Sequence, residues 1–449
     1  MTTIPELLRS RAAETPDRTF LVFEGLETTY RELDERSDRV ASALIAQGIG
    51  AGDAVAVCMG NRPEFLLAWW GILKAGAALV PVNPALRPPE VDYIRRDSGA
   101  RLMLTDAPEA PPLPQLPELR PDGLAAIVYT SGTTGKPKGA MLSHANYLWD
   151  AEAIAKATRM TEADRFLCIL PLFHVNAQVV TTLAPMVAGG SMVLMGKFSP
   201  IEMLETLART GCSAFSGVPT VYTVLNNTPG AQEYDLSRLR FCICGAAPMP
   251  VEVFREFERK YAATIVEGYG LTEGTCASSV NPLARRKIGS IGVALDGQEM
   301  KLVDGEILIR GPNVMSGYFK NPTATAEAIR DGWLCTGDLA RVDEDGYFYL
   351  VGRKKEMIIR GGQKIYPKEV EEVLYQHPAV AEAAVAGIAD AKWGEEVVAY
   401  VVRRGEVTEA ELIDFCGQRL AGFKCPKAVC FREALPKTAT GKIQKHLLE

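Results

Sequence analysis

Alternating helix-like and strand-like segments in the first half of the chain constrain its fold more than any other feature. Residues 28–48 begin with a capping threonine, carry apolar residues at helical spacing and end at a glycine. An apolar strand-like run (54–60), a helix-like run (63–76) and a second strand-like run (77–83) follow. Repeated strand–helix–strand units with almost continuously apolar strands predict an α/β fold whose mostly parallel sheets are covered on both faces.

The chain length of 449 residues is too great for one hydrophobic core, so we expect two or more domains. Six prolines lie between Ala107 and Pro121. Such a run favours an extended connection and predicts a linker between two subdomains. The pattern changes again after Arg353, where helix-like and strand-like runs between residues 367 and 420 predict a small α+β unit.

The composition favours a water-soluble globular protein, with 47% hydrophobic and 23% charged residues. A formal net charge of −6 argues against a general nucleic-acid partner. Residues 166–196 contain no Asp, Glu, Lys or Arg, but polar residues, proline and glycine interrupt them. We therefore expect a buried helix followed by a buried strand there, and no membrane span.

The ten cysteines and the N-terminus bear on the compartment. No His or Cys stands at zinc-binding spacing, and Cys242 and Cys244 alternate along one strand-like run. We interpret the cysteines as buried free thiols of a reducing compartment. The N-terminal residues lack the apolar core of a signal peptide, so we expect a cytoplasmic protein.

Residues 129–139, YTSGTTGKPKG, combine glycines, hydroxyls and two lysines directly after an apolar strand-like run. Glycines let backbone N–H groups approach a ligand, hydroxyls add donors, and lysines neutralise charge, which suits a polyphosphate. The spacing differs from that of the common P-loop, because no Ser or Thr follows a Gly-Lys pair. The alternative is a flexible surface loop.

Further motifs follow, each with an ordinary alternative. EGYGLTEG (267–274) places an aromatic ring, a hydroxyl and a carboxylate on one turn, and LPLFHVN (170–176) carries a histidine in an apolar run. CTGD (335–338) contains an aspartate, and PKTATGK (436–442) ends in a lysine near the C-terminus. Alone, they are typical of turn packing, a core histidine, a helix cap and a solvated tail.

Five motifs in order resemble those of adenylate-forming (AMP-binding) enzymes of the acyl- and aryl-CoA synthetase branch, over essentially the whole chain. They are YTSGTTGKPKG, EGYGLTE, CTGD, GRKKEMIIRGGQKIYPKEVE and PKTATGK. The resemblance implies a ligase in which a carboxylate attacks the α-phosphate of ATP. The thiol of coenzyme A then displaces AMP from the acyl-adenylate. It also implies a large N-terminal domain (1–353) of βα-layered sheets with a β-barrel-like subdomain, and a small mobile α+β domain (354–449).

The resemblance assigns most motif residues to ATP and Mg²⁺. The implied phosphate-binding loop comprises Thr130, Ser131, Gly132, Thr133, Thr134, Gly135 and Lys138. The implied adenine site comprises Gly245, Ala246, Ala247, Glu267, Gly268, Tyr269 and Gly270. The implied ribose-binding pair is Asp338 and Arg353, and the implied metal ligands are Thr134 and Glu273. Lys442, Thr272, Glu273 and His174 are the implied catalytic residues, with Lys442 at the carboxylate and α-phosphate and Thr272 at the α-phosphate. His174 is expected to gate the acyl pocket and not to act as a general base.

The acid and the thiol have their own implied residues. The acyl pocket is expected to be lined by His174, Val175, Asn176, Ser216, Gly217, Val218, Gly268, Gly270 and Cys276. These are small to medium and mostly neutral, and we expect Gly268 and Gly270 to leave room for a medium aliphatic or aromatic acid. Lys355 matches the hinge of the C-terminal domain. Gly361 and Gly362 match a turn that leaves room for the pantetheine arm of coenzyme A.

Alternatives to coenzyme A remain open, because Gln363 and Lys364 depart from the pattern of many CoA ligases. The acyl group could pass to a carrier-protein thiol supplied in trans or to a nitrogen nucleophile. A nucleotide-binding sensor is a non-enzymatic alternative, against which the retained Glu273 and Lys442 argue. The expected partners are a small carboxylic acid and coenzyme A, with no nucleic acid and no membrane span, and a homodimer is compatible with the resemblance.

Overall fold

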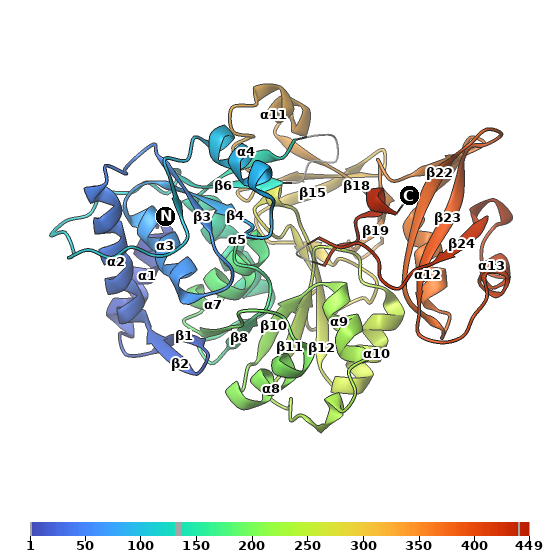
Figure 1. Cartoon of the computed structure of the whole chain (residues 1–449), viewed down its shortest axis with the longest axis horizontal. Coiled ribbons are helices and arrows are strands. Elements are labelled where there is room, and N and C mark those ends of the chain that lie inside the picture. Colours follow the sequence, from blue (N-terminus) through green and yellow to red (C-terminus); the bar gives the residue numbers. More distant parts are fainter. Residues whose placement is uncertain (1, 131–135, 439–440, 449) are drawn as a thin grey trace.

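The computed structural model describes residues 2–130, 136–438 and 441–448 (Figure 1). Four β-sheets and their covering helices build it. Three of the sheets belong to the large N-terminal part, and the fourth belongs to a separate C-terminal domain on the right of Figure 1. Ser131, Gly132, Thr133, Thr134 and Gly135, which the sequence assigns to phosphate and metal binding, lie outside the described residues.

The first sheet has the strand order β5-β3-β4-β6-β7, and only the pair β6–β7 is antiparallel. Its strands are β3 (Ala54–Cys58), β4 (Ala78–Val82), β5 (Leu102–Leu104), β6 (Leu124–Thr130) and β7 (Lys138–Ser143). Its helices are α2 (Tyr30–Ala46), α3 (Pro63–Lys74) and α4 (Pro88–Ser98). The Thr29 side chain caps α2 in a capping box, and the predicted strand–helix–strand order is confirmed.

The second sheet has nine strands in the order β14-β13-β12-β11-β10-β8-β9-β1-β2. They are β1 (Thr19–Phe23), β2 (Leu26–Thr29), β8 (Arg165–Cys168), β9 (Ser191–Leu194), β10 (Ala214–Gly217), β11 (Phe241–Cys244), β12 (Thr264–Tyr269), β13 (Ser279–Val280) and β14 (Val293–Ala294). Helices α1 (Ile4–Glu14), α5 (His144–Ala157), α8 (Pro200–Thr210), α9 (Pro219–Asn226) and α10 (Val251–Tyr261) belong to the same part. The run from β8 through β12 is parallel, so the loops that follow these strands meet at one edge.

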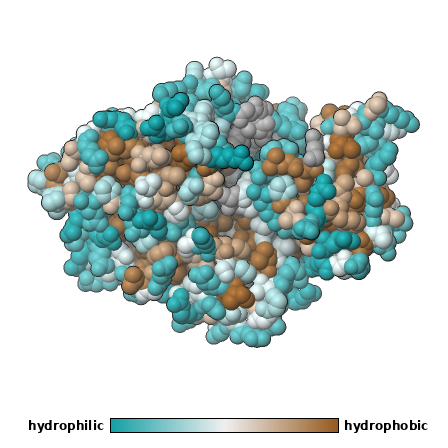
Figure 2. Space-filling model, viewed as in Figure 1, coloured by the Kyte–Doolittle hydropathy of each residue, from teal (hydrophilic) through white to brown (hydrophobic). Residues whose placement is uncertain are grey.

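The uncharged run 166–196 starts with β8 and ends with β9. Between them lie α6 (Val175–Gln178), a π-helical turn (Val179–Leu183) and α7 (Ala184–Val187), nearly all buried. The predicted buried helix followed by a buried strand is confirmed. In the described residues, no helix is long and apolar enough to cross a membrane. On the face shown in Figure 2, hydrophobic and hydrophilic residues are interspersed.

The third sheet is antiparallel and lies in the part of the chain for which a β-barrel-like subdomain is predicted. It contains β15 (Glu299–Val303), β16 (Glu306–Arg310), β17 (Ile329–Arg330), β18 (Trp333–Val342) and β19 (Phe348–Arg353), with α11 (Pro322–Ala328) beside it. A bridge between Gly292 and Phe348 joins it to the end of the nine-stranded sheet. This junction brings β18 and β19 towards the edge where the parallel strands end.

The C-terminal domain has its own sheet and its own apolar core. Its strands are β20 (Ile358–Arg360), β21 (Gln363–Ile365), β22 (Val380–Asp390), β23 (Gly394–Arg403) and β24 (Ala428–Phe431), and its helices are α12 (Pro367–Tyr375) and α13 (Glu409–Gly417). Buried residues such as Val370, Val385 and Leu412 form the core between sheet and helices. The placement of the domain boundary after Arg353 stays a prediction.

The proline-rich segment does not separate two subdomains, so that prediction was wrong. The strands that flank it, β5 and β6, belong to one sheet. The segment runs along α2, where the Ala110 N–H donates to the Arg39 carbonyl (3.1 Å) and the Leu113 N–H donates to Ser42 Oγ (2.9 Å). Proline has no N–H for a strand ladder, so an extended proline run can cross the surface of a sheet without joining it.

Candidate active site

The motif residues of the N-terminal part meet where β10, β11 and β12 end. In register, Gly217 pairs with Cys244, and Cys244 pairs with Glu267. The turns that follow these strands therefore lie next to one another, as expected for parallel strands. They carry Val218, the turn 245–247 and the turn 270–276, so the structure brings together the predicted adenine, phosphate and acyl residues of this edge.

Asp338 and Arg353 face each other on neighbouring strands of the third sheet. Arg353 Nε donates to Asp338 Oδ1 (2.9 Å), and the Tyr269 hydroxyl donates to Asp338 Oδ2 (2.7 Å). Burial and the Asp338 carboxylate hold the pKa of Tyr269 well above its ordinary value, so the hydroxyl stays a donor. Asp338 is buried while Arg353 is half exposed, which leaves polar groups of the pair open to a ligand.

Glu273 lies in a short 3₁₀ turn (Thr272–Gly274) after β12. Its Oε1 accepts hydrogen bonds from the Tyr318 hydroxyl (2.8 Å) and from Thr130 Oγ1 (3.4 Å). The Lys138 ammonium lies 5.1 Å from the centre of the Tyr318 ring. The described ends of the glycine-rich loop thus lie beside Glu273. Tyr318 was not predicted, because nothing in the run SGYFKNP links it to Glu273.

Lys442 comes to this cluster from the opposite end of the chain. The Thr220 hydroxyl donates to the carbonyl of the neighbouring Gly441 (3.4 Å), which fixes the C-terminal tail on the N-terminal part. Burial and the Arg353 guanidinium lower the pKa of Lys442 to about 8, while Asp338 and Glu273 act in the opposite direction. The lysine therefore lies within electrostatic reach of the ribose-binding pair and of Glu273.

His174 stands just before α6 and its ring packs on Phe173, with ring centres 4.7 Å apart. Burial, together with the Lys442 charge, lowers the pKa of His174 to about 4. The imidazole is thus neutral at neutral pH and close to Lys442. This position between the tail and α6 fits the predicted place beside the acyl pocket.

The predicted acyl-pocket residues cluster around α6 and the ends of β10 and β12. The Ser216 hydroxyl donates to Asn176 Oδ1 (2.9 Å), and Val175 and Val218 are buried. Gly270 does not leave room for the acid as predicted. A Cβ atom there would lie 1.8 Å from the Cys276 carbonyl oxygen, so the returning chain fills that space and requires a glycine.

The adenine turn contains Ala246 in the left-handed region, with φ +69°. Glu267, within β12, is buried, and its Oε2 finds no hydrogen-bond partner in the parts of the chain that the structure describes. Burial raises the pKa of Glu267 to about 8, and Lys368 of α12 acts in the opposite direction. Glu267 therefore lies close to the C-terminal domain as well as to the predicted adenine site.

The predicted CoA turn and hinge lie at the start of the C-terminal domain. Gly361 (φ +55°) and Gly362 (φ +82°) join β20 to β21 in conformations that favour glycine. A Cβ on Gly361 would lie 2.7 Å from the Trp393 ring, whereas no atom lies within 4 Å of the corresponding position at Gly362. Lys355 lies in the turn between β19 and β20, the connection between the two parts.

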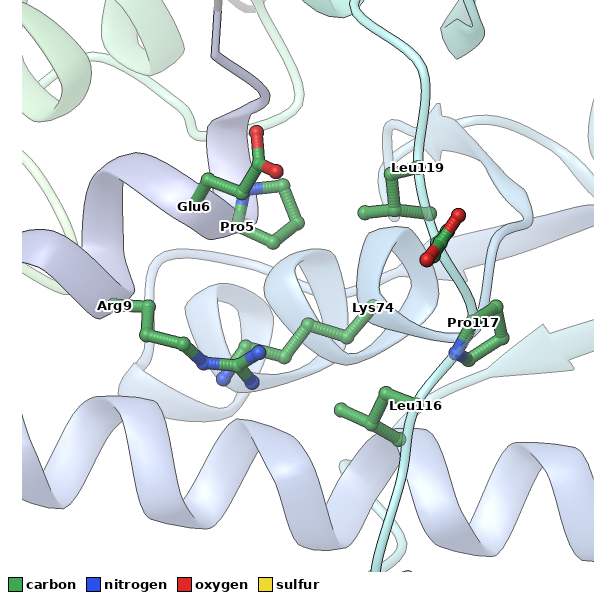
Figure 3. Close-up of a pocket in the computed structure, with 8 residues that line it drawn as sticks. Pro5, Glu6, Arg9, Lys74, Leu116, Pro117 and Leu119 are labelled. Atoms are coloured by element: carbon green, nitrogen blue, oxygen red, sulfur yellow. The ribbon is translucent and has the colours of Figure 1, made fainter.

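A separate cavity of about 400 Å³ lies between α1, α3 and the proline-rich segment (Figure 3). Its lining is Pro5, Glu6, Arg9, Lys74, Leu116, Pro117, Glu118 and Leu119. Lys74 Nζ donates to the carboxylates of Asp34 (2.5 Å) and Asp38 (2.6 Å) and to the Asp34 carbonyl. All three ammonium hydrogens are therefore used within the fold, and none of the motif residues lines this cavity.

The chain matches the model of the AMP-binding enzyme family over residues 8–118 and 106–319. Residues 369–442 match the model of the C-terminal domain of AMP-binding enzymes. The chain belongs to the AMP-binding enzyme family. The two matched segments of this AMP-binding enzyme overlap at residues 106–118, within the proline-rich run.

Similar proteins cover nearly the whole chain. Feruloyl-CoA synthase from an Amycolatopsis species is 38% identical, with 97% of this chain and 96% of that protein covered. A long-chain-fatty-acid–CoA ligase of Bacillus subtilis strain 168 is 34% identical, with 100% and 94% covered. The structure of o-succinylbenzoate CoA synthetase from Bacillus subtilis with its acyl-adenylate has a TM-score of 0.90 at 33% identity, with 100% and 99% covered.

Proposed function

We propose that this AMP-binding enzyme is an ATP-dependent carboxylic acid:coenzyme A ligase. It would form an acyl-adenylate and pyrophosphate, and then an acyl- or aryl-CoA thioester and AMP. The observation that carries the proposal is that Lys442 lies within electrostatic reach of Arg353, Asp338 and Glu273. The similarity to several CoA ligases supports it.

The adenylation step joins two anions, so it needs positive charge at the phosphate and exclusion of water. Lys442 would supply a cation to the carboxylate of the acid and to the α-phosphate. Asp338 and Arg353 would hold the ribose hydroxyls, and Thr130 and Lys138 would bind phosphate oxygens. The acid is already ionised at neutral pH, so no protein base is required, in line with a neutral His174 beside the acyl pocket.

Magnesium fits this site as a partner of ATP. The described residues contain no group of three or more His, Cys, Asp or Glu side chains that could hold a metal ion by themselves. Mg²⁺ binds commonly through one or two carboxylates with phosphate and water oxygens, which Glu273 next to the phosphate loop could complete. When bound, the metal would neutralise phosphate charge. The Bacillus subtilis synthetase has been solved with ATP and a magnesium ion.

Coenzyme A as acceptor, Lys355 as hinge and a mobile domain beginning after Arg353 belong to the same proposal. Gly362 supports it, because the space beside this glycine is open. In the present arrangement Lys442 lies within electrostatic reach of Glu273 and of the Asp338–Arg353 pair, so under this proposal thioester formation would require the C-terminal domain to move. We also propose that the protein is a homodimer, which analytical ultracentrifugation would test.

ATP–pyrophosphate exchange over a panel of acids tests the proposal most directly. We expect exchange with aromatic or medium aliphatic acids, and thioester formation only when coenzyme A is added. A carrier-protein thiol and hydroxylamine serve as alternative acceptors in parallel assays. ATP binding without acid-dependent exchange would indicate a nucleotide sensor and would refute the ligase.

A further inference from the structure

The turn that follows Glu273 is strained. Thr275 has φ +65° and ψ −68°, and its side chain is buried. The Cys276 N–H donates to the Gly274 carbonyl (2.8 Å), which closes a three-residue γ-turn around Thr275. A γ-turn with positive φ is rare, and a β-branched residue in it is a genuine outlier, so the surrounding structure must hold it in place.

The strained turn sends the chain directly back over the strand it has just left. The Cys276 carbonyl occupies the position of a Gly270 side chain, as described above. Thr272 and Glu273 stand between these two residues on the reversed segment. Their positions therefore depend on the reversal being kept.

Asn313 holds one side of the turn. Its carbonyl accepts a hydrogen bond from Thr275 Oγ1 (2.7 Å), and its Nδ2 donates to the Gly274 (3.3 Å) and Ala277 (3.2 Å) carbonyls. The Met315 N–H donates to the Glu273 carbonyl (2.8 Å). These contacts come from the loop after β16 and fix the turn to the third sheet.

Asp150 of α5 holds the other side. It is fully buried, and its Oδ2 accepts a hydrogen bond from the Ala277 N–H (2.9 Å). Its Oδ1 finds no partner among the residues that the structure describes. Burial raises the pKa of Asp150 well above its ordinary value, whereas the backbone N–H groups of the turn act in the opposite direction. A buried carboxyl without a charge partner is costly in a fold, and the proposed adenylation chemistry does not use it.

We propose that Asp150 is a positioning residue of the adenylation site, and that its bond to the Ala277 N–H keeps the strained turn that presents Thr272 and Glu273. The inference rests on the proposed function. Asp150 stands outside every motif of the sequence, on a helix that contributes no predicted site residue. It would act from behind the turn, without touching substrate.

Asp150→Ala and Asp150→Asn separate this role from core packing. Asparagine has the same shape as aspartic acid, and its amide oxygen can still accept from the Ala277 N–H, so we expect exchange within about threefold of wild type. Alanine removes the acceptor, and we expect kcat for exchange to fall about 10- to 100-fold, as for small misplacements of catalytic groups. KM for the acid should change little, because Asp150 does not contact it. If the alanine variant does not fold, exchange is measured in Asp150→Ser, which keeps a hydroxyl at this position.

Asp164→Ala is the matched control. Asp164 is equally buried but precedes β8, at the opposite end of the parallel strands, where it binds Arg240 and Ser213. Its loss should lower the thermal unfolding temperature and leave kcat per folded molecule unchanged. Both variants are compared by folded fraction, from circular dichroism, before the rates are assigned.

A second-site change gives the sharpest test. Thr275→Gly relieves the strain, since glycine adopts φ +65° freely. In this background, Asp150→Ala should cost much less than in wild type, about threefold or less, because changes that act on the same turn couple non-additively. Equal losses in both backgrounds, or wild-type kcat in the folded Asp150→Ala enzyme, would overturn the positioning role. A wild-type chain without exchange on any acid would instead overturn the proposed function, and the inference with it.

Discussion

The two halves of the candidate site are held in different ways. On the N-terminal side, Asp338 and Arg353 lie on paired strands, and the Asp338 carboxylate accepts hydrogen bonds from Arg353 (2.9 Å) and from Tyr269 (2.7 Å). Lys442, by contrast, lies on the C-terminal tail. The carbonyl of its neighbour Gly441 accepts one long hydrogen bond (3.4 Å) from the Thr220 hydroxyl. Strand pairing pre-organises Asp338 and Arg353, whereas under the proposed domain movement the lysine would be in place only while the C-terminal domain stays docked. This difference predicts that the two half-reactions can be damaged separately.

Lys442→Ala should have the largest effect. We expect adenylate formation to fall about 100- to 1000-fold, because a cation that stabilises the transition state is lost. Conversion of a supplied acyl-adenylate to the thioester should stay near wild type, since an interaction made in one transition state affects only that step. Lys437→Ala is the control, because Lys437 pairs with Glu382 inside the C-terminal domain (2.7 Å). Equal loss in both half-reactions would contradict a lysine that leaves the site before thioester formation.

Glu273→Gln should have the second-largest effect, and it tests the N-terminal half of the site. The substitution keeps the size but removes the charge beside the phosphates, so we expect exchange to fall about 100-fold. Raising the Mg²⁺ concentration should restore part of the rate if the metal is bound through this carboxylate. Glu344→Gln is the matched control, because Glu344 is an exposed glutamate in the turn between β18 and β19. Wild-type exchange in Glu273→Gln would remove Glu273 from the metal site.

The sequence could predict the pre-organised half well, because local patterns specify it. Glycine-rich turns after apolar strands locate the edge where parallel strands end, and the resemblance adds Asp338 and Arg353. The resemblance also supplies Lys442 of the other half, which no local pattern specifies. Tyr318, Asn313 and Asp150 could not be found in this way, since their roles depend on contacts between segments distant in the chain. The proline-rich run misled for a related reason: its composition indicates an extended segment but not which elements it joins. Gly270 was misread because only the fold shows the returning Cys276 carbonyl.

Gly362→Asn should affect the second half-reaction alone. Asparagine tolerates the left-handed conformation better than other residues, and no atom lies within 4 Å of its Cβ position in this arrangement. Adenylation should therefore be spared. If this turn faces the site during thioester formation, the added side chain would obstruct the thiol, and we expect that step to slow about tenfold or more. Gly332→Asn, at an open left-handed glycine in the third sheet, controls for the substitution itself.

The pH dependence distinguishes a charged lysine from a structural one. Because the pKa of Lys442 is lowered to about 8, kcat/KM for exchange should fall about tenfold per pH unit above 8. Stability should change in the opposite direction. The folded state holds the ammonium at a cost while it is charged, and this cost disappears as pH rises from 8 towards the ordinary value of 10.5. In Lys442→Arg, which stays charged, the decrease in kcat/KM above pH 8 should disappear, although the rate is lower. If the decrease persists in Lys442→Arg, a group other than Lys442 causes it.

Glu256→Gln should have the smallest effect and probes the docking itself. Glu256 on α10 pairs with Arg404 of the C-terminal domain at 3.6 Å, and both side chains are about 30% exposed (29% and 32%). Such pairs contribute roughly 0–1 kcal/mol, so loss of this one should reduce exchange at most about fivefold, without slowing thioester formation from supplied acyl-adenylate. The difference from wild type should shrink at high salt, which screens exposed charges. Glu252→Gln is the matched control, because Glu252 pairs with Arg255 on its own helix. If both substitutions reduce exchange equally, the effect comes from α10 and not from docking of the domain that delivers Lys442.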